Sequence, residues 1–107
     1  MTDRVAQHFA MFNDAVRQQD WAVFLATFAP DAVMAFDGVA VGPYTGLDEI
    51  TNAYATRPPT DTMTCESVAR DGDTDIVRFA WDAGGHGTMR VTWRADQVAA
   101  LTITFEA

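Results

Sequence analysis

The sequence of 107 residues contains no lysine, a single cysteine and no long apolar run. The lone cysteine, Cys65, excludes an internal disulfide, and we expect it to be a small core residue beside Met63. No segment approaches the roughly 18 apolar residues of a membrane-spanning helix, and the first ten residues lack the apolar centre of a signal peptide. We therefore expect a cytoplasmic protein that has no membrane partner.

Basic side chains are also scarce. Seven arginines stand against 15 acidic residues, which gives a formal net charge of -8 at pH 7. A surface of this sign repels phosphate backbones, so nucleic acid is not an expected partner. His8 and His86 are far apart and have no cysteine or carboxylate at ligand spacing, so we expect neither a metal site nor a cofactor. The acidic residues Asp71, Asp73 and Asp75 are expected to form a solvated turn.

Apolar residues make up 49% of the chain, a fraction that is typical of folded domains and excludes disorder as the default. Residues 1–107 are expected to form one domain, because the chain is too short for two. Thr2 or Asp3 can cap a first helix that carries apolar residues at helical spacing and ends near Gln19. Asp20 can cap a short second helix, which Pro30 would end.

A strand over residues 32–36 is expected next, followed by the turn signal Asp37-Gly38 and a short partner strand at 39–41. A third helix should begin at Thr45 and end before Pro58.

From residue 62 onward, apolar and polar residues alternate between turn signals, which predicts a four-stranded antiparallel meander. The alternation places nine residues on the side that the helices would cover: Val77, Phe79, Trp81, Met89, Val91, Trp93, Leu101, Ile103 and Phe105. The other side carries arginines and threonines. That face is too polar for a core and suits the contact of a homodimer.

The order of these elements and the phrases QQDWAVFLATFAPDAV and GPYTGLDEI resemble the nuclear transport factor 2-like (NTF2-like) superfamily, in its SnoaL-like and ketosteroid isomerase-like branch. The resemblance implies an α+β cone, in which three N-terminal helices pack in the concave face of a curved, mostly antiparallel sheet. The superfamily includes isomerases, cyclases, dehydratases and non-enzymatic binding modules, so the resemblance implies the fold more narrowly than the function.

In ketosteroid isomerase an aspartate moves a proton beside a carbonyl, while a tyrosine and a protonated aspartic acid hold the enolate oxygen. The positions of this chain that resemble the two oxygen donors are Phe12 and Met89, and neither side chain can donate a hydrogen bond. One such donor typically contributes about 2.7–4 kcal/mol to transition-state stabilisation. Steroid isomerisation by that mechanism is therefore not expected.

The position that resembles the catalytic base is ambiguous. Counting forward from Asp31 gives Phe36, whereas counting back from Gly46 gives Asp37, so the chain has one extra residue between these anchors. A β-bulge before Asp37 would turn its carboxylate into an apolar cavity, as a base of raised pKa. Otherwise the pleat points Phe36 inward, and Asp37 is only a turn residue.

Other side chains could complete a site. His8, four residues before Phe12, could reach a pocket as an acid or base or could flank the helix exposed to solvent. The hydroxyl of Tyr44 or of Tyr54 could replace the missing oxygen donor. Otherwise Tyr44 packs in its loop and Tyr54 belongs to the apolar stripe of the helix, and packing is the favoured interpretation for Tyr54. The expected ligand-binding wall is apolar and consists of Phe12, Phe36, Trp81, Met89 and Trp93. Alternatively, these large side chains meet and fill the space.

We expect a SnoaL-like protein whose conical pocket binds a small, mostly apolar molecule. If it is an enzyme, it is a cofactor-independent isomerase, cyclase or lyase that moves a proton with Asp37, assisted by His8 or Tyr44. The alternative is a non-catalytic binding or dimerisation module, and a weaker third option is a carrier that leaves its ligand unchanged. The direction of Asp37 and an open pocket distinguish the first two.

Overall fold

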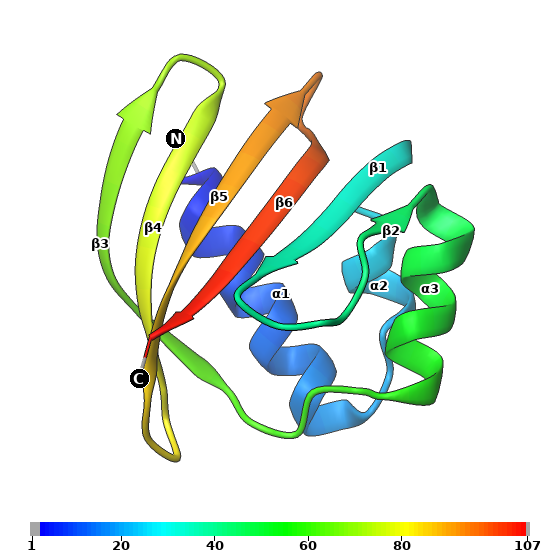
Figure 1. Cartoon of the computed structure of the whole chain (residues 1–107), viewed down its shortest axis with the longest axis horizontal. Coiled ribbons are helices and arrows are strands. Elements are labelled where there is room, and N and C mark those ends of the chain that lie inside the picture. The colour runs from blue at the N-terminus through cyan, green and yellow to red at the C-terminus, as the bar shows by residue number, and fades with distance from the viewer. Residues whose placement is uncertain (1–2, 107) are drawn as a thin grey trace.

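The computed structural model describes residues 3–106, in which three helices lie on the concave side of one curved six-stranded sheet (Figure 1). The helices are α1 (Arg4–Gln18), α2 (Ala22–Leu25) and α3 (Leu47–Thr56). The strands are β1 (Phe28–Asp37), β2 (Tyr44–Thr45), β3 (Met63–Asp71), β4 (Thr74–Trp81), β5 (His86–Arg94) and β6 (Gln97–Glu106). Their order is β2-β1-β6-β5-β4-β3, and only the β1–β6 pair is parallel among the described strands. The expected α+β cone is confirmed.

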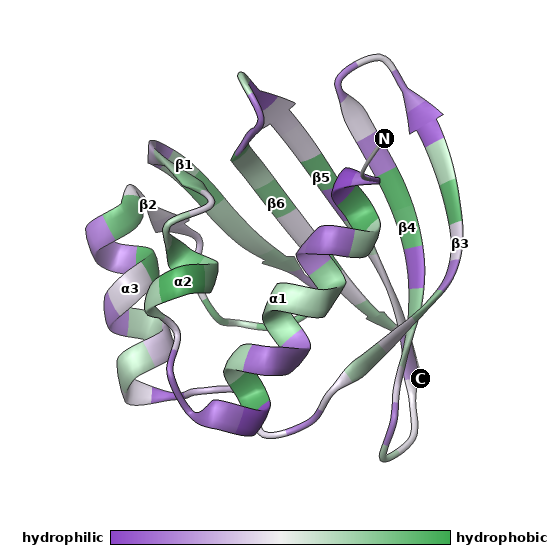
Figure 2. Cartoon of the chain, turned by 180° about the vertical axis from the view of Figure 1, so that it is seen from behind, coloured by the Kyte–Doolittle hydropathy of each residue, from purple (hydrophilic) through white to green (hydrophobic). Residues whose placement is uncertain are grey.

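Helix α1 forms where the sequence predicts it. The Asp3 carboxylate accepts a hydrogen bond from the Val5 amide at 2.9 Å, and Gln19 ends the helix in the left-handed region. Thr2, the other candidate cap, lies outside the described residues. Seen from the helix side, α1 alternates hydrophilic and hydrophobic residues, as a helix with one buried face must (Figure 2). No helix in the described part of the chain is long and apolar enough to span a membrane.

The second helix is shorter than expected. The Asp20 carboxylate accepts a hydrogen bond from the Ala22 amide, but β1 already begins at Phe28 and passes through Pro30. The pairing of β1 with β6 is irregular between Phe28 and Val33. Proline lacks an amide hydrogen and is tolerated where a ladder is irregular. The expectation that Pro30 ends a helix is therefore wrong.

The short strand expected at 39–41 does not form. Residues 38–43 are a loop, and β2 instead pairs its two residues, Tyr44 and Thr45, with Met34 and Val33 of β1. Gly38 in this loop has a φ of 81°, which favours glycine. The pairing fixes Tyr44 beside Met34, at the open end of the cone.

The meander of β3 to β6 is confirmed, and its inner face packs on the helices. Two expectations about individual residues in it are wrong. Cys65 is exposed, because it lies on the edge strand β3, where only Met63 is buried. Asp75 is fully buried, because it shares the inward parity of Val77 and Phe79 on β4.

Candidate functional site

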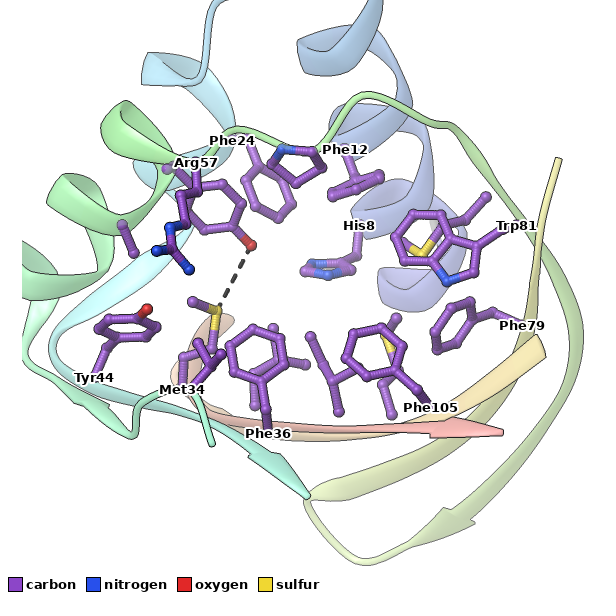
Figure 3. A pocket seen from close by; sticks show the side chains of 18 residues that line it. His8, Phe12, Phe24, Met34, Phe36, Tyr44, Arg57, Phe79, Trp81 and Phe105 are labelled. Carbon is purple, nitrogen blue, oxygen red and sulfur yellow. Dashed lines mark hydrogen bonds between the residues drawn. The ribbon is translucent and has the colours of Figure 1, made fainter. Parts of the chain in front are cut away.

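A pocket of about 280 Å³ lies between the helices and the inner face of the sheet (Figure 3). Side chains from α1, α3, β1 and the central strands line it, and nearly all of this wall is apolar. The volume is near the lower end of the roughly 300–1,000 Å³ typical of ligand pockets. The aromatic residues therefore leave a cavity for a small molecule rather than filling the cone.

The direction of Phe36 and Asp37 follows from the register of β1. From Val33 onward β1 pairs with β6 without a break, with Phe36 opposite Ile103 and Asp37 opposite Thr104. The pleat places Phe36 in the pocket wall with Ile103. Asp37 is exposed, and its carboxylate accepts a 3.4 Å hydrogen bond from the Thr104 hydroxyl.

The alternative with an inward Asp37 required a bulge before this residue. An irregularity does occur there, but it ends at Val33, and the regular pairing that follows leaves the carboxylate pointing outward. Asp37 does not line the pocket, so it is not placed to act as a base on a molecule bound there. Of the two alternatives left open by the sequence, the structure has the one in which Phe36 points inward, and the assignment of Asp37 as the base is corrected.

The remaining expected site residues divide between two places. Six of them line the pocket, namely His8, Phe12, Phe36, Tyr44, Trp81 and Met89. Trp93 does not line it, and its indole nitrogen donates a 3.0 Å hydrogen bond to Asp75. The expectation that Trp93 forms part of this wall is therefore wrong.

His8 is a buried imidazole at the centre of the pocket wall. Its ring is 5% exposed and lies 5.1 Å from the ring of Phe24, centroid to centroid. Burial lowers the pKa of His8 to about 4, so the ring is neutral at pH 7 and has one donor and one acceptor nitrogen. The His8 ring has no hydrogen-bond partner among residues 3–106. Every fully buried side-chain nitrogen or oxygen in this part of the chain does have a partner, so the ring nitrogens of His8 are not fully buried. The ring nitrogens therefore reach the hollows that His8 lines, which are this pocket (Figure 3) and a second one bordered by Arg4 and Trp93.

The lowered pKa of His8 predicts a stability change in mild acid. Because the folded pKa, about 4, is below the unfolded value of 6.5, the unfolded chain binds the proton more tightly. Stability is then complete above pH 6.5 and is lost as the pH falls toward 4. Between pH 7 and pH 4.5 the unfolding free energy of the wild type should fall by about 2 kcal/mol because of His8. The His8→Phe variant has no titratable group at this position and should not show this fall. Urea unfolding at both pH values measures this, and parallel losses in the two proteins would contradict it.

The sequence offered the Tyr54 hydroxyl as one candidate oxygen donor but favoured packing for this side chain, and the structure gives it both roles in the pocket wall. The Tyr54 ring stacks on Trp21 at 4.8 Å, and its hydroxyl donates to the Met34 sulfur at 3.7 Å (Figure 3). Burial raises the pKa of Tyr54, so the hydroxyl stays protonated at neutral pH. A thioether is a weak acceptor, so this donor can turn to a better acceptor on a ligand. Helical spacing alone gave no signal of this role.

Arg57 is a polar group of the pocket that the sequence did not reveal. Its backbone amide bonds to the Ala53 carbonyl at 2.9 Å at the end of α3, and Pro58 prevents the helix from continuing. The side chain reaches the pocket at the end where Tyr44 lies (Figure 3). Arg57 is itself exposed to solvent, and no sequence pattern distinguishes it from an exposed arginine that lies away from a pocket.

The chemistry of the pocket follows from these groups. Among the described residues that line it there is no aspartate or glutamate. The described part of the chain also holds no group of three histidine, cysteine, aspartate or glutamate residues that could bind a metal ion. The pocket can enclose an apolar body, donate a hydrogen bond from Tyr54, present the neutral imidazole of His8 and offer one cation at its mouth.

No match was found among curated proteins. Several solved structures share the fold over nearly the whole chain. A proposed polyketide cyclase from Sinorhizobium meliloti is 22% identical, with a TM-score of 0.69, over 95% of this chain and 99% of that one. A proposed isomerase from Bacillus subtilis is 14% identical, with a TM-score of 0.79, over 96% and 86%.

A SnoaL-like protein from Burkholderia thailandensis is 14% identical, with a TM-score of 0.75, over 100% of this chain and 98% of that one. At these identities the likeness shows the fold alone. The family model of the SnoaL-like domain matches residues 6–105, nearly the whole sequence. This chain belongs to the SnoaL-like domain family of the NTF2-like superfamily.

Proposed function

We propose that this SnoaL-like domain binds a small, mostly apolar molecule whose oxygen accepts a hydrogen bond from Tyr54. The observation that carries the proposal is the Tyr54 hydroxyl, which is buried and protonated and, among residues 3–106, has only the Met34 sulfur as an acceptor. A buried donor without a good acceptor typically costs about 1–3 kcal/mol. A carbonyl ligand would remove that cost while its apolar body covers the aromatic wall. The neighbours described as a proposed polyketide cyclase and a proposed isomerase support a small organic ligand.

A matched pair of ligands tests this proposal. Calorimetry and thermal shift would compare 1-indanone with indane, which has the same rings and no carbonyl. Tyr54→Phe should weaken indanone binding about fivefold, the value of one hydrogen bond of about 1 kcal/mol, and leave indane binding unchanged. Asp37→Asn is the control and should bind both as the wild type does, because Asp37 lies on the outer face. Binding of neither compound, or equal weakening by Asp37→Asn, would contradict the proposal.

A second candidate function is proton transfer in the same pocket, which the open ring nitrogens of His8 favour. His8 would accept a proton from the carbon beside a bound carbonyl, while the Tyr54 hydroxyl holds the enolate oxygen. A pKa of about 4 makes His8 a weak base before a ligand binds. Deuterium exchange beside the carbonyl of 1-indanone in D₂O would reveal this activity. Exchange no faster than in buffer would oppose catalysis and leave binding as the function.

The homodimer stays a prediction. The outer face of the sheet carries exposed Arg90 and half-buried Thr92, Thr102 and Thr104, as the alternation predicted. A non-catalytic dimerisation module would use this face and leave the pocket empty. That alternative is opposed by any ligand that binds in the pocket and responds to Tyr54→Phe.

A further inference from the structure

We propose that the natural ligand of this pocket is an organic anion, an apolar body with one carboxylate that binds Arg57 and Tyr44. The inference rests on the proposed function, because it assumes that the pocket binds a small molecule. Beyond the proposed function, the inference assigns a negative charge to the ligand and states which end of the pocket its charged group occupies.

The charge distribution of the chain makes Arg57 unusual. The protein has a formal net charge of -8, yet Arg57 is the only ionised residue among the described residues that line the pocket. Arg4, Arg17, Arg70 and Arg94 each form an ion pair with an aspartate. Arg57 has no such partner among residues 3–106. An acidic protein thus keeps one unpaired cation at the mouth of its apolar cavity, where a bound anion would pair with it.

The donors at this end of the pocket converge. Figure 3 shows the guanidinium of Arg57 and the hydroxyl of Tyr44 facing the same space. The buried Tyr54 also lines the pocket, and its hydroxyl bonds to Met34, the strand partner of Tyr44. The Tyr44 ring is held by its edge contact with Phe36, at 6.4 Å between centroids, and by the pairing of β2 with β1. A guanidinium offers two parallel N–H donors that match the two oxygens of a carboxylate.

At the opposite end of the pocket, none of the described lining residues is charged. Phe12, Phe79 and Trp81 form an aromatic surface there, and the His8 beside them is neutral at pH 7. An apolar body would cover this surface, and a charged group placed there would lose its hydration without a partner. The pocket therefore has one end that suits an anion and one end that excludes it, which sets the direction of the ligand.

The test compares 2-naphthoic acid with 2-naphthamide, which has nearly the same shape and no charge. Calorimetry at pH 7 should show that the wild type binds the acid about tenfold more tightly than the amide. Arg57→Gln should reduce this preference to less than about twofold and keep the amide affinity, which also shows that the variant is folded. Arg90→Gln makes the same change of charge on the outer face and should keep the tenfold preference.

Equal binding of acid and amide by the wild type would overturn the inference and leave the proposed function intact. Equal loss of the preference in Arg57→Gln and Arg90→Gln would also overturn it, because the effect would then come from net charge alone. If neither compound binds in the pocket, the proposed function and the inference both fail.

Discussion

Replacing Asp75 by asparagine is expected to lower the free energy of unfolding by about 3 kcal/mol, the lower end of the cost of breaking a buried ion pair. The side chain of Asp75 is fully buried and accepts bonds from Arg4 at 2.8 Å, Arg70 at 3.0 Å and the Trp93 indole at 3.0 Å. These contacts join α1, β3 and β5 to β4. The two arginines remain partly solvated when the charge is lost, so the expected cost stays at that lower end.

The control for this substitution is Asp73→Asn, two residues earlier. Asp73 is exposed, so the same loss of charge should change the unfolding free energy by less than about 0.5 kcal/mol. Urea denaturation of both variants at pH 7 measures the difference. A cost for Asp75→Asn no larger than that of Asp73→Asn would show that the buried network does not stabilise the fold.

The Asp75 network also has its own pH dependence. Burial raises the pKa of Asp75, but the bonds from Arg4, Arg70 and Trp93 together outweigh burial and hold the pKa below its usual value. The stability that this carboxylate contributes is therefore present above the unfolded pKa, about 3.9, and is lost only as the pH falls below it. The loss due to His8 occurs between pH 6.5 and about 4, so the two effects occupy different pH ranges.

Replacing Phe24 by alanine is expected to cost about 3–5 kcal/mol, the usual cost of truncating a buried aromatic residue. Phe24 is 1% exposed, and its ring lies 5.1 Å from His8, 5.7 Å from Phe12 and 5.9 Å from Tyr54. It therefore joins α1 and α3 at the wall of the pocket. Val23→Ala on the same helix is the control and should change stability little, because Val23 is 68% exposed.

The space left by Phe24→Ala should open into the pocket and stay apolar. Benzene is expected to stabilise this variant more than the wild type, because an apolar cavity of this kind binds benzene. Thermal unfolding with and without benzene measures the difference. An equal shift in both proteins would mean that the core collapses and that no joined cavity forms.

The sequence predicted the fold well because periodic patterns reflect backbone geometry. Period-two alternation placed Val77, Phe79 and Met89 on the inner face of the sheet, and helical spacing placed Phe12 on the buried face of the first helix. The same alternation extends back to Asp75 and indicates that its side chain points inward. The neighbouring acidic residues Asp71 and Asp73 favoured an exposed turn instead, and that interpretation was wrong for Asp75.

Other features could not be predicted because they depend on tertiary contacts. Pro30 is a helix stop by propensity, but irregular pairing with β6 allows it in β1. The choice between Phe36 and Asp37 required the register of β1, which only the neighbouring strand fixes. Tyr54 and Arg57 reach the pocket because of the way α3 packs on the sheet, and helical spacing cannot distinguish a pocket residue from a core residue.

The proposed ligand, a small and mostly apolar molecule, would bind between the helices and the inner face of the sheet. The methionines allow a direct test, because Met34, Met63 and Met89 line the pocket and Met11 does not. Their ¹³C-labelled methyl signals, assigned through Met→Leu variants, would be followed while 1-indanone or 2-naphthoic acid is added. We expect the signals of Met34, Met63 and Met89 to shift together and saturate while Met11 stays in place. Saturation with neither compound, or shifts at Met11 alone, would contradict the proposal.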